Sequence, residues 1–167
     1  SVGLLAAAPT RGGRDVLAEE DFIQTVINDV GAITRVTGKT PRRVIIYTAP
    51  QWKRNVFTDV LVAVRGGERN PGNVIKALLA RPDLKPYAKE LAAFVPRAFK
   101  DALDRAATER GLPGFDEQAV LEGARDFLAQ TLNVDALEVF RADDAAAPDP
   151  GKKRGVAAPF KPALYIE

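Results

Sequence analysis

The amino-acid sequence predicts an α+β fold, in which a small β-sheet of about three strands carries four to six helices packed on it. Three observations lead to this prediction. Several segments repeat apolar residues at helical spacing, and three short runs are rich in β-forming residues. Their order along the chain is helix, strand, helices, strand, strand, and we find no internal repeat.

The first predicted helix begins near Leu17 and ends at Gly38. Acidic residues in its first turn suit the positive end of the helix dipole, and glycine commonly follows the end of a helix. One apolar stripe runs along it, formed by Ile23, Val26, Ile27, Val30 and Ile33. Residues 1–16 are interpreted as a linker and residues 17–167 as one module, because Pro, Gly and Thr gather before the helix.

A buried strand is predicted over residues 44–48, which are apolar and β-rich and are followed by Pro50. A second helix, roughly 51–65, comes directly after it. Trp52 and four later apolar residues form its core-facing stripe. We expect the cations Lys53, Arg54 and Arg65 to lie off that stripe, at the solvent.

Three more helical segments are predicted between this helix and the next strand. A short helix covers 73–81, and a longer helical region covers 86–110, where Pro96 predicts a kink or two separate helices. The third segment starts at Asp116 or Glu117 and runs to about Leu132. Its core-facing residues are expected to be Val120, Phe127 and Leu128.

The last two predicted strands are 137–141 and 163–166. We expect them to pair antiparallel, which would make the connecting loop, 142–162, a long hairpin tip that projects from the sheet. The loop is rich in Ala, Asp, Pro and Lys, and three consecutive cations lie at its tip, within residues 149–155.

Composition excludes several classes of function. The chain of 167 residues has 46% hydrophobic and 28% charged residues, which is typical of a globular domain. It contains no Cys and no His, and its only Ser is Ser1. Disulfides, thiolate metal sites and every catalytic arrangement that needs His are therefore excluded. No apolar run is long enough to span a membrane and no signal peptide is evident, so we expect a cytoplasmic protein.

Charge is strongly segregated along the chain, although 24 Lys and Arg nearly balance 22 Asp and Glu. Residues 30–58 carry six cations and no acid, whereas residues 101–144 carry 11 acids and four cations. Such segregation can make one face attractive to a polyanion, and it can equally reflect ordinary solvated helix faces. Nucleic-acid binding and protein docking both stay open at this point.

No cluster of residues has the composition of a catalytic, metal or nucleotide site, and no P-loop motif is present. The sequence therefore predicts no catalytic residue, no metal site and no cofactor in this chain. Basic residues remain as candidates, because Lys and Arg bind phosphates without catalytic apparatus. The candidate RNA-binding residues are Arg42, Arg43, Lys53, Arg54, Lys152, Lys153, Arg154 and Lys161. Trp52 is interpreted as a core residue rather than a base-stacking platform.

Two segments carry a resemblance to a known family. Residues 20–30 lead into 41–54, which contains Tyr47-Thr48-Ala49-Pro50-Gln51-Trp52-Lys53, and the chain ends with Lys161-Pro162-Ala163-Leu164-Tyr165-Ile166-Glu167. Together they resemble the C-terminal region of leucyl-tRNA synthetases of the archaeal and eukaryotic cytosolic type. The resemblance covers about residues 17–167, and in the middle, 66–135, it holds only in pattern. It would make residues 1–16 the end of the preceding anticodon-binding helical domain.

The resemblance implies a module that binds leucine tRNA, with its long variable arm, near the outer corner of the molecule, while aminoacylation occurs elsewhere. The class I signature motifs cannot be present without His and Met, so this chain alone would not activate leucine. The full-length enzyme would use ATP and Mg²⁺. The implied partners are leucine tRNA and the remainder of the synthetase, with no membrane. The alternative is a protein-interaction module that docks a partner, or the body of the synthetase, through the acidic segment 101–144.

Overall fold

The computed structural model describes residues 15–108 and 111–167 and divides them into two units. We call the first the sheet unit; it comprises the chain up to Ala49 together with Pro113–Glu167. The second, Pro50–Leu112, we call the helical unit. Most of the predicted linker, residues 1–14, lies outside the described residues, and Asp15 and Val16 already belong to the start of the first helix.

Helix α2 (Val16–Thr37) begins and ends where the sequence predicts. The Asp15 carboxylate accepts a hydrogen bond from the Ala18 backbone N–H at 3.1 Å and caps the first turn. At the other end Gly38 has a φ of 69°, which favours glycine as a helix stop. Phe22, Val26 and Val30 recur every four residues and make up the buried apolar face. Ile33, expected on that face, is 37% exposed.

Three strands form a mixed sheet in the order β2–β1–β3. The central strand β1 (Arg43–Thr48) pairs parallel with β2 (Ala136–Arg141) and antiparallel with β3 (Ala163–Ile166). The predicted hairpin of the last two strands is therefore wrong, because β1 lies between them. Alternation within a short strand shows which residues share a face, but it contains no information about the neighbouring strand. The most apolar strand takes the centre, where both faces are covered.

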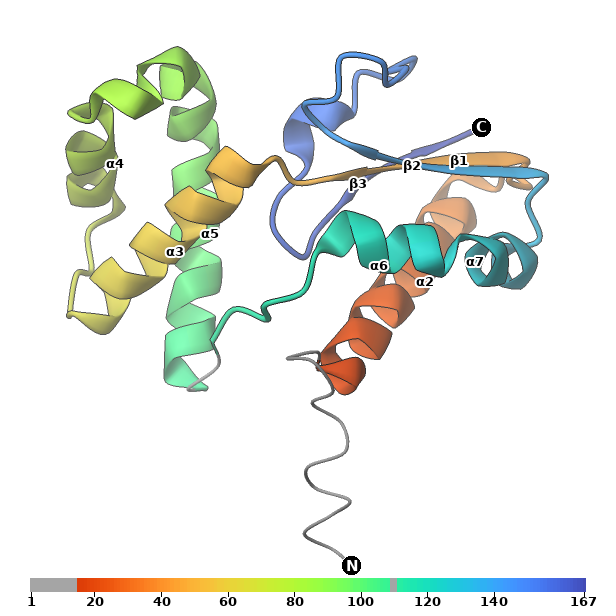
Figure 1. Ribbon diagram of the computed structural model, residues 1–167, viewed down its shortest axis with the longest axis horizontal. Coiled ribbons are helices and arrows are strands. Elements are labelled where there is room, and N and C mark those ends of the chain that lie inside the picture. The colour runs from red at the N-terminus through yellow and green to blue at the C-terminus, as the bar shows by residue number, and fades with distance from the viewer. Residues whose placement is uncertain (1–14, 109–110) are drawn as a thin grey trace, which may run out of the picture. The chain divides into compact units, whose positions relative to one another are not determined.

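One face of the sheet packs against helices and the other against a loop (Figure 1). On one face Val44 and Ile46 of β1 join a core with α2, α6 (Glu117–Gly123) and α7 (Arg125–Leu132). On the other face Ile45 and Tyr47 lie beneath the loop 142–162, which contains the short 3₁₀ helix η3 (Arg154–Val156). The loop expected to project from the sheet therefore covers the sheet instead.

The single helix predicted up to Leu132 is divided at Ala124 into α6 and α7. Its predicted start is confirmed, since the Asp116 carboxylate accepts hydrogen bonds from two backbone N–H groups of the first turn, at 3.0 and 3.2 Å. Leu128 is fully buried as expected, whereas Phe127 is 57% exposed. The break at Ala124 leaves Leu121 and Leu128 in the same core, and Phe127, next to Leu128, lies on the exposed side of α7.

The helical unit contains α3 (Gln51–Arg65), α4 (Pro71–Leu79), the 3₁₀ helix η2 (Pro82–Tyr87) and α5 (Ala88–Ala107). Helix α5 runs through Pro96 as one helix, and Pro96 itself is exposed. Ala92, whose carbonyl loses its partner to Pro96, is also on the exposed side, so water can satisfy that carbonyl. The other side of α5 is buried and consists of Leu91, Phe94, Val95, Ala98, Phe99 and Ala102.

Within the described residues the structure has six α-helices and one three-stranded sheet, which confirms the predicted α+β class. None of the helices in this part of the chain is long and apolar enough to cross a membrane.

Candidate nucleic-acid interface

The loop between β2 and β3 packs on the sheet through small residues. Ala142, Ala147 and Ala157 of the loop are buried in one cluster with Ile45 and Tyr47 of β1. Alanine side chains let the loop backbone approach the sheet closely, which leaves its carbonyl groups facing inward and in need of donors. The alanine-rich composition of 142–162 is therefore typical of a tightly packed cover and not of a free tip.

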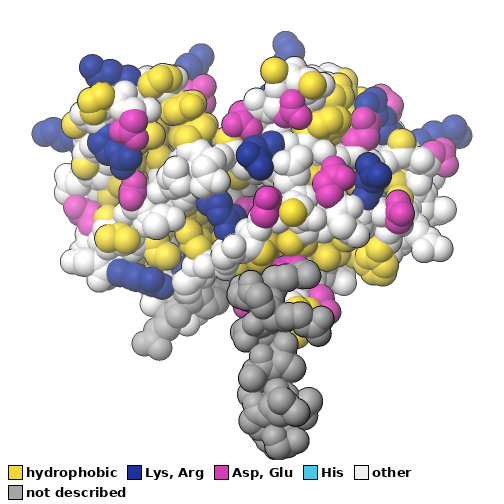
Figure 2. Space-filling model, in the orientation of Figure 1, with side chains coloured by type: hydrophobic (Ala, Val, Ile, Leu, Met, Phe, Trp, Pro, Cys, Tyr) yellow, Lys and Arg dark blue, Asp and Glu magenta, His cyan; other side chains and the backbone are white. Residues whose placement is uncertain are grey.

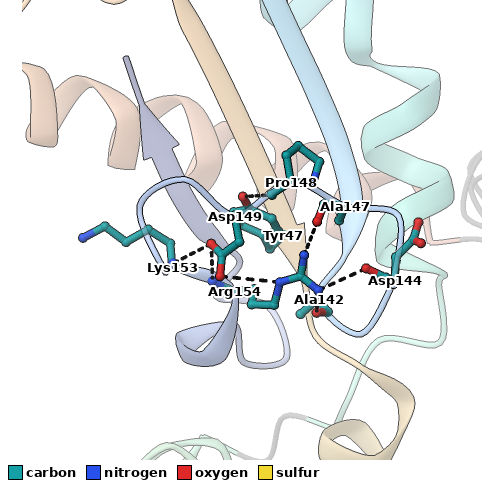
Figure 3. Close-up of polar contacts among 8 residues, drawn as sticks. All are labelled: Tyr47, Ala142, Asp144, Ala147, Pro148, Asp149, Lys153 and Arg154. Carbon is teal, nitrogen blue, oxygen red and sulfur yellow. Dashed lines mark hydrogen bonds and ion pairs between the residues drawn. The ribbon is translucent and has the colours of Figure 1, made fainter.

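Arg154 supplies those donors (Figure 3). One terminal nitrogen of its guanidinium donates to the carbonyl of Ala142 at 3.3 Å and to that of Asp144 at 3.0 Å, and the other donates to the carbonyl of Ala147. The sequence predicts Arg154 as an RNA-binding residue, but the structure directs its guanidinium into the loop. We therefore assign it the role of holding the loop in shape.

Asp149 fixes the turn that precedes Arg154. Its carboxylate accepts hydrogen bonds from the backbone N–H of Lys153 at 2.7 Å and of Arg154 at 3.3 Å, and it pairs with the Arg154 Nε at 3.5 Å. Lys152 adopts the left-handed conformation, with a φ of 53°. The side chains of Lys152 and Lys153 are both exposed. The turn thus presents two adjacent ammonium groups from a backbone that is already ordered, as Figure 3 shows for Lys153.

Gly151 brings this turn against the sheet. A Cβ at this position would lie 2.5 Å from Cδ1 and 2.9 Å from Cε1 of the Tyr165 ring, which is closer than real Cβ contacts. Glycine is therefore required by the approach of the backbone to Tyr165. The Tyr165 hydroxyl in turn donates to the Glu167 carboxylate at 3.0 Å. Two residues of the terminal motif thus support the lysine-bearing turn.

The two arginines that precede the central strand differ in their surroundings. Arg43 forms an ion pair with Glu138 at 2.8 Å and a longer one with Glu167 at 3.9 Å, so two carboxylates from the flanking strands offset its charge. The hydrogen bond to Glu138 raises the pKa of Arg43 further. Arg42 is exposed, and its backbone continues the central strand by hydrogen bonds to both sides, with Glu167 and with Asp135 and Ala136. Of this pair, Arg42 is the cation available to a polyanion.

Lys161 lies apart from the lysines of the turn. The preceding residue, Phe160, packs with Phe22 and Phe115, and its backbone N–H donates to the Glu117 carboxylate at 3.1 Å. Lys161 is exposed, and it lies close enough to α2 to act on Asp29. Burial raises the pKa of Asp29, and the charge of Lys161 partly offsets that rise. Lys161 thus belongs with the helix-covered face of the sheet, whereas Lys152 and Lys153 belong to the loop that covers the opposite face.

In the helical unit, Lys53 is 4% exposed, so its expected solvent position is wrong. Its Nζ lies 5.8 Å from the centroid of the Trp52 ring and 5.4 Å from that of Phe94. Burial, aided by the nearby charge of Arg97, lowers the pKa of Lys53 to about 8, and Glu90 opposes the shift. Lys53 shares the helical stripe of Phe57, Val60 and Val64, a periodicity that could have placed it inside.

Two neighbours of Lys53 complete the sequence-predicted set in this unit. Arg54 is half-buried. Trp52 is also half-buried and stacks on Tyr87, with ring centroids 4.5 Å apart and an angle of 10° between the planes. The Trp52 ring contacts Phe94 edge-on as well, at 6.0 Å, so it contributes to the packing of α3 on α5. The interpretation of Trp52 as a packing residue agrees with these contacts.

Sequence reasoning missed a group of exposed cations on α5, namely Lys89, Arg97 and Lys100. They are widely spaced along the chain, whereas the candidates were chosen as neighbours in sequence. Helical periodicity is the signal that finds them, since spacings of 8 and 11 residues return to one side of a helix.

The acids of segment 101–144 are divided between the two units. Several have structural partners. Asp101 lies 3.7 Å from Arg105, Glu122 lies 3.7 Å from Arg125, and Glu138 pairs with Arg43. Asp116 and Glu117 accept backbone hydrogen bonds, as described above. In the described part of the chain, no group of three or more acidic side chains is arranged to hold a metal ion.

Comparisons with known proteins give a consistent answer. No protein-family model matches the chain. The chain is 39% identical to the leucine–tRNA ligase of Methanosarcina barkeri over 152 residues, and this alignment covers 89% of the chain and 15% of that protein. The leucine–tRNA ligase of Pyrococcus abyssi is 33% identical over 154 residues, or 92% of this chain and 14% of that protein. The corresponding ligase of Methanothermobacter thermautotrophicus is 32% identical, over 92% of this chain and 15% of that protein.

The chain thus spans about one seventh of the length of these curated relatives. The matched length agrees with a C-terminal domain, as the two sequence motifs indicate. By this similarity along almost its whole length, the chain belongs to the family of the archaeal leucine–tRNA ligases, of which it represents a small region.

Proposed function

We propose that this chain is the tRNA-binding appendage of a leucine–tRNA ligase. It would hold leucine tRNA by the long variable arm and the outer corner, while the remainder of the ligase carries out aminoacylation with ATP and Mg²⁺. Under this proposal it acts in translation, in the cytoplasm. The observation that carries the proposal is the similarity to leucine–tRNA ligases over about nine tenths of the chain.

The chemistry of the described residues supports a binding role. The sequence has no His and no Cys, and lysines and arginines are among its exposed polar groups. Of the basic residues singled out by sequence, those exposed in the sheet unit are Lys152 and Lys153 on the ordered turn, Arg42 next to the central strand, and Lys161. Such groups recognise RNA by its backbone and shape. A turn that is already ordered loses little conformational entropy when it binds.

The isolated chain is expected to bind weakly. A few phosphate contacts correspond to dissociation constants of about 10⁻⁴ to 10⁻⁶ M at physiological salt. In the complete ligase a second attachment to the same tRNA would raise the effective concentration and hence the affinity.

The test is a fluorescence-anisotropy titration of the 167-residue chain with transcribed leucine tRNA at several salt concentrations. A leucine tRNA with a shortened variable arm is the RNA control. We expect binding that weakens with salt and with loss of the arm. Equal binding of both RNAs would contradict recognition of the arm, and failure to bind either would favour docking on protein.

A double variant, Lys152→Gln with Lys153→Gln, tests the turn. Because each lost phosphate contact lowers the salt slope by roughly 0.7–0.9, the expected decrease is about 1.5. The matched control is Lys39→Gln with Lys76→Gln, which removes the same charge from two exposed positions elsewhere. An unchanged slope in the first variant would remove the turn from the interface.

A further inference from the structure

The helical unit carries most of the excess positive charge of the chain. Residues 50–112 contain 12 Lys and Arg and 7 Asp and Glu, whereas the rest of the chain contains 12 and 15. A polyanion is therefore attracted mainly to the helical unit, although most of the basic residues singled out by sequence lie in the sheet unit. Part of this charge is concentrated and exposed on helix α5.

Three cations share one side of α5, and we call Lys89, Arg97 and Lys100 the α5 basic face. At 100° per residue, Lys100 is about 20° and Arg97 about 80° around the helix from Lys89. Eleven residues at 1.5 Å each separate the first from the last, so the face is about 16 Å long. Ala93 and Pro96 lie between them on the exposed side. A small residue and a proline leave the cations sterically accessible to a broad ligand.

Within the described residues, none of the three cations of the α5 basic face makes an ion pair or a hydrogen bond through its side chain. Other cations of the same unit are engaged. Arg81 pairs with Asp59 at 2.7 Å and with Asp83 at 2.8 Å. In this part of the chain the α5 basic face thus carries three cations that are not engaged in ion pairs, with an exposed acid, Asp104, on the same side of the helix, about 60° from Lys89.

The helix that carries the face is held firmly. Its opposite side is buried in the core of the unit, with Leu91 and Val95 fully enclosed. At its start lies Tyr87, half-buried and stacked on Trp52. The Trp52–Tyr87 pair packs toward the buried side of α5, so it holds the start of the helix while the cations on the exposed side stay available to RNA phosphates. Figure 2 shows Lys and Arg side chains standing out from the surface of the helical unit.

We propose that the α5 basic face binds the phosphate backbone of RNA, as a contact surface separate from the Lys152–Lys153 turn. That this RNA is leucine tRNA rests on the proposed function. The two surfaces lie in different units, and each would contribute its own phosphate contacts. About three phosphates fit along the face, one for each cation.

The experiment compares two triple variants of the full chain. The test variant is Lys89→Gln, Arg97→Gln and Lys100→Gln. The control variant, Lys39→Gln, Arg141→Gln and Lys76→Gln, also removes two lysines and one arginine from exposed positions, but from three separate places: the connection between α2 and β1, β2, and α4. Circular dichroism and thermal unfolding verify the fold of both. Affinity is measured against leucine tRNA and against an unrelated RNA hairpin, at several salt concentrations.

We expect the test variant to lose roughly tenfold or more in affinity and about 2–3 units of salt slope for leucine tRNA, and the control to lose less than half of that. If the wild-type chain binds leucine tRNA and the test variant matches the control, the inference is overturned while the proposed function stands. If the wild-type chain binds both RNAs equally and only the test variant is weakened, the α5 surface is supported and the proposed specificity for leucine tRNA fails. If the wild-type chain binds neither RNA, both are overturned.

Discussion

Replacement of Gly151 by alanine tests the packing of the lysine-bearing turn on the sheet. The added Cβ would lie 2.5 Å from Cδ1 of Tyr165 and 2.9 Å from Cε1, within the body of the ring. Either the ring or the turn has to move, and overpacking of this kind typically costs about 1–3 kcal/mol. For a protein of this size the corresponding decrease in Tm is roughly 3–10 °C. Urea and thermal unfolding followed by circular dichroism would measure both quantities.

Gly155 provides a matched control in the same loop. A Cβ there would meet nothing within 4 Å, and the residue has no positive φ. Gly155→Ala is therefore expected to change the free energy of unfolding by no more than about 0.5 kcal/mol. If Gly151→Ala changed the free energy of unfolding as little as Gly155→Ala does, the close approach of the Gly151 backbone to Tyr165 would be incorrect.

A double-mutant cycle separates the clash from other effects. In a Tyr165→Ala background the ring is absent, so Gly151→Ala should cost almost nothing. The expected coupling energy between the two sites is about 1–3 kcal/mol, the same as the cost in the parent chain. A coupling energy near zero would mean that the destabilisation by Gly151→Ala arises from the backbone and not from the ring.

Three further predictions concern single residues. Arg154→Lys should lower the free energy of unfolding by about 2–4 kcal/mol, because it leaves buried carbonyl groups of the loop without donors. Chemical denaturation would show this decrease. An unchanged denaturation midpoint would mean that the Arg154 guanidinium is free to bind RNA. The Lys53 ammonium should titrate near pH 8 by NMR of its side chain, and since the unfolded chain keeps that proton up to about pH 10.4, this group should make the free energy of unfolding rise with pH between those values. An ordinary lysine pKa would show that Lys53 is solvated. Asp116→Ala should cost about 1 kcal/mol through loss of the α6 cap, and no loss in urea unfolding would contradict the capping assignment.

Sequence patterns were sufficient to place the main elements of the fold. The strand at 44–48 and the helix at 51–65 agree with β1 and α3, because a continuous apolar run and a clear helical stripe are strong local signals. The pairing of the strands was not accessible in the same way. Which strand lies beside which is decided by how the whole chain covers the sheet, and no local pattern encodes it.

The candidate site was only partly predictable for a related reason. The sequence does not distinguish a cation that is exposed, such as Lys153, from one that donates hydrogen bonds to backbone carbonyls, such as Arg154. The role of Arg154 depends on the fold of a loop rich in alanine. The α5 basic face, in contrast, could have been found from helical spacing alone, since Lys89, Arg97 and Lys100 recur on one side of the helix.

The most direct test of the account is to map which lysines RNA protects on the wild-type chain. Lysines are acetylated with a water-soluble reagent, with and without saturating leucine tRNA, and the rates at each position are measured by mass spectrometry. Buried Lys53 serves as the internal reference, because it should react slowly in both samples. The account predicts protection at Lys89, Lys100, Lys152 and Lys153, and little change at Lys39 and Lys76. Protection of Lys39 and Lys76 to the same degree, or protection at no position, would contradict it.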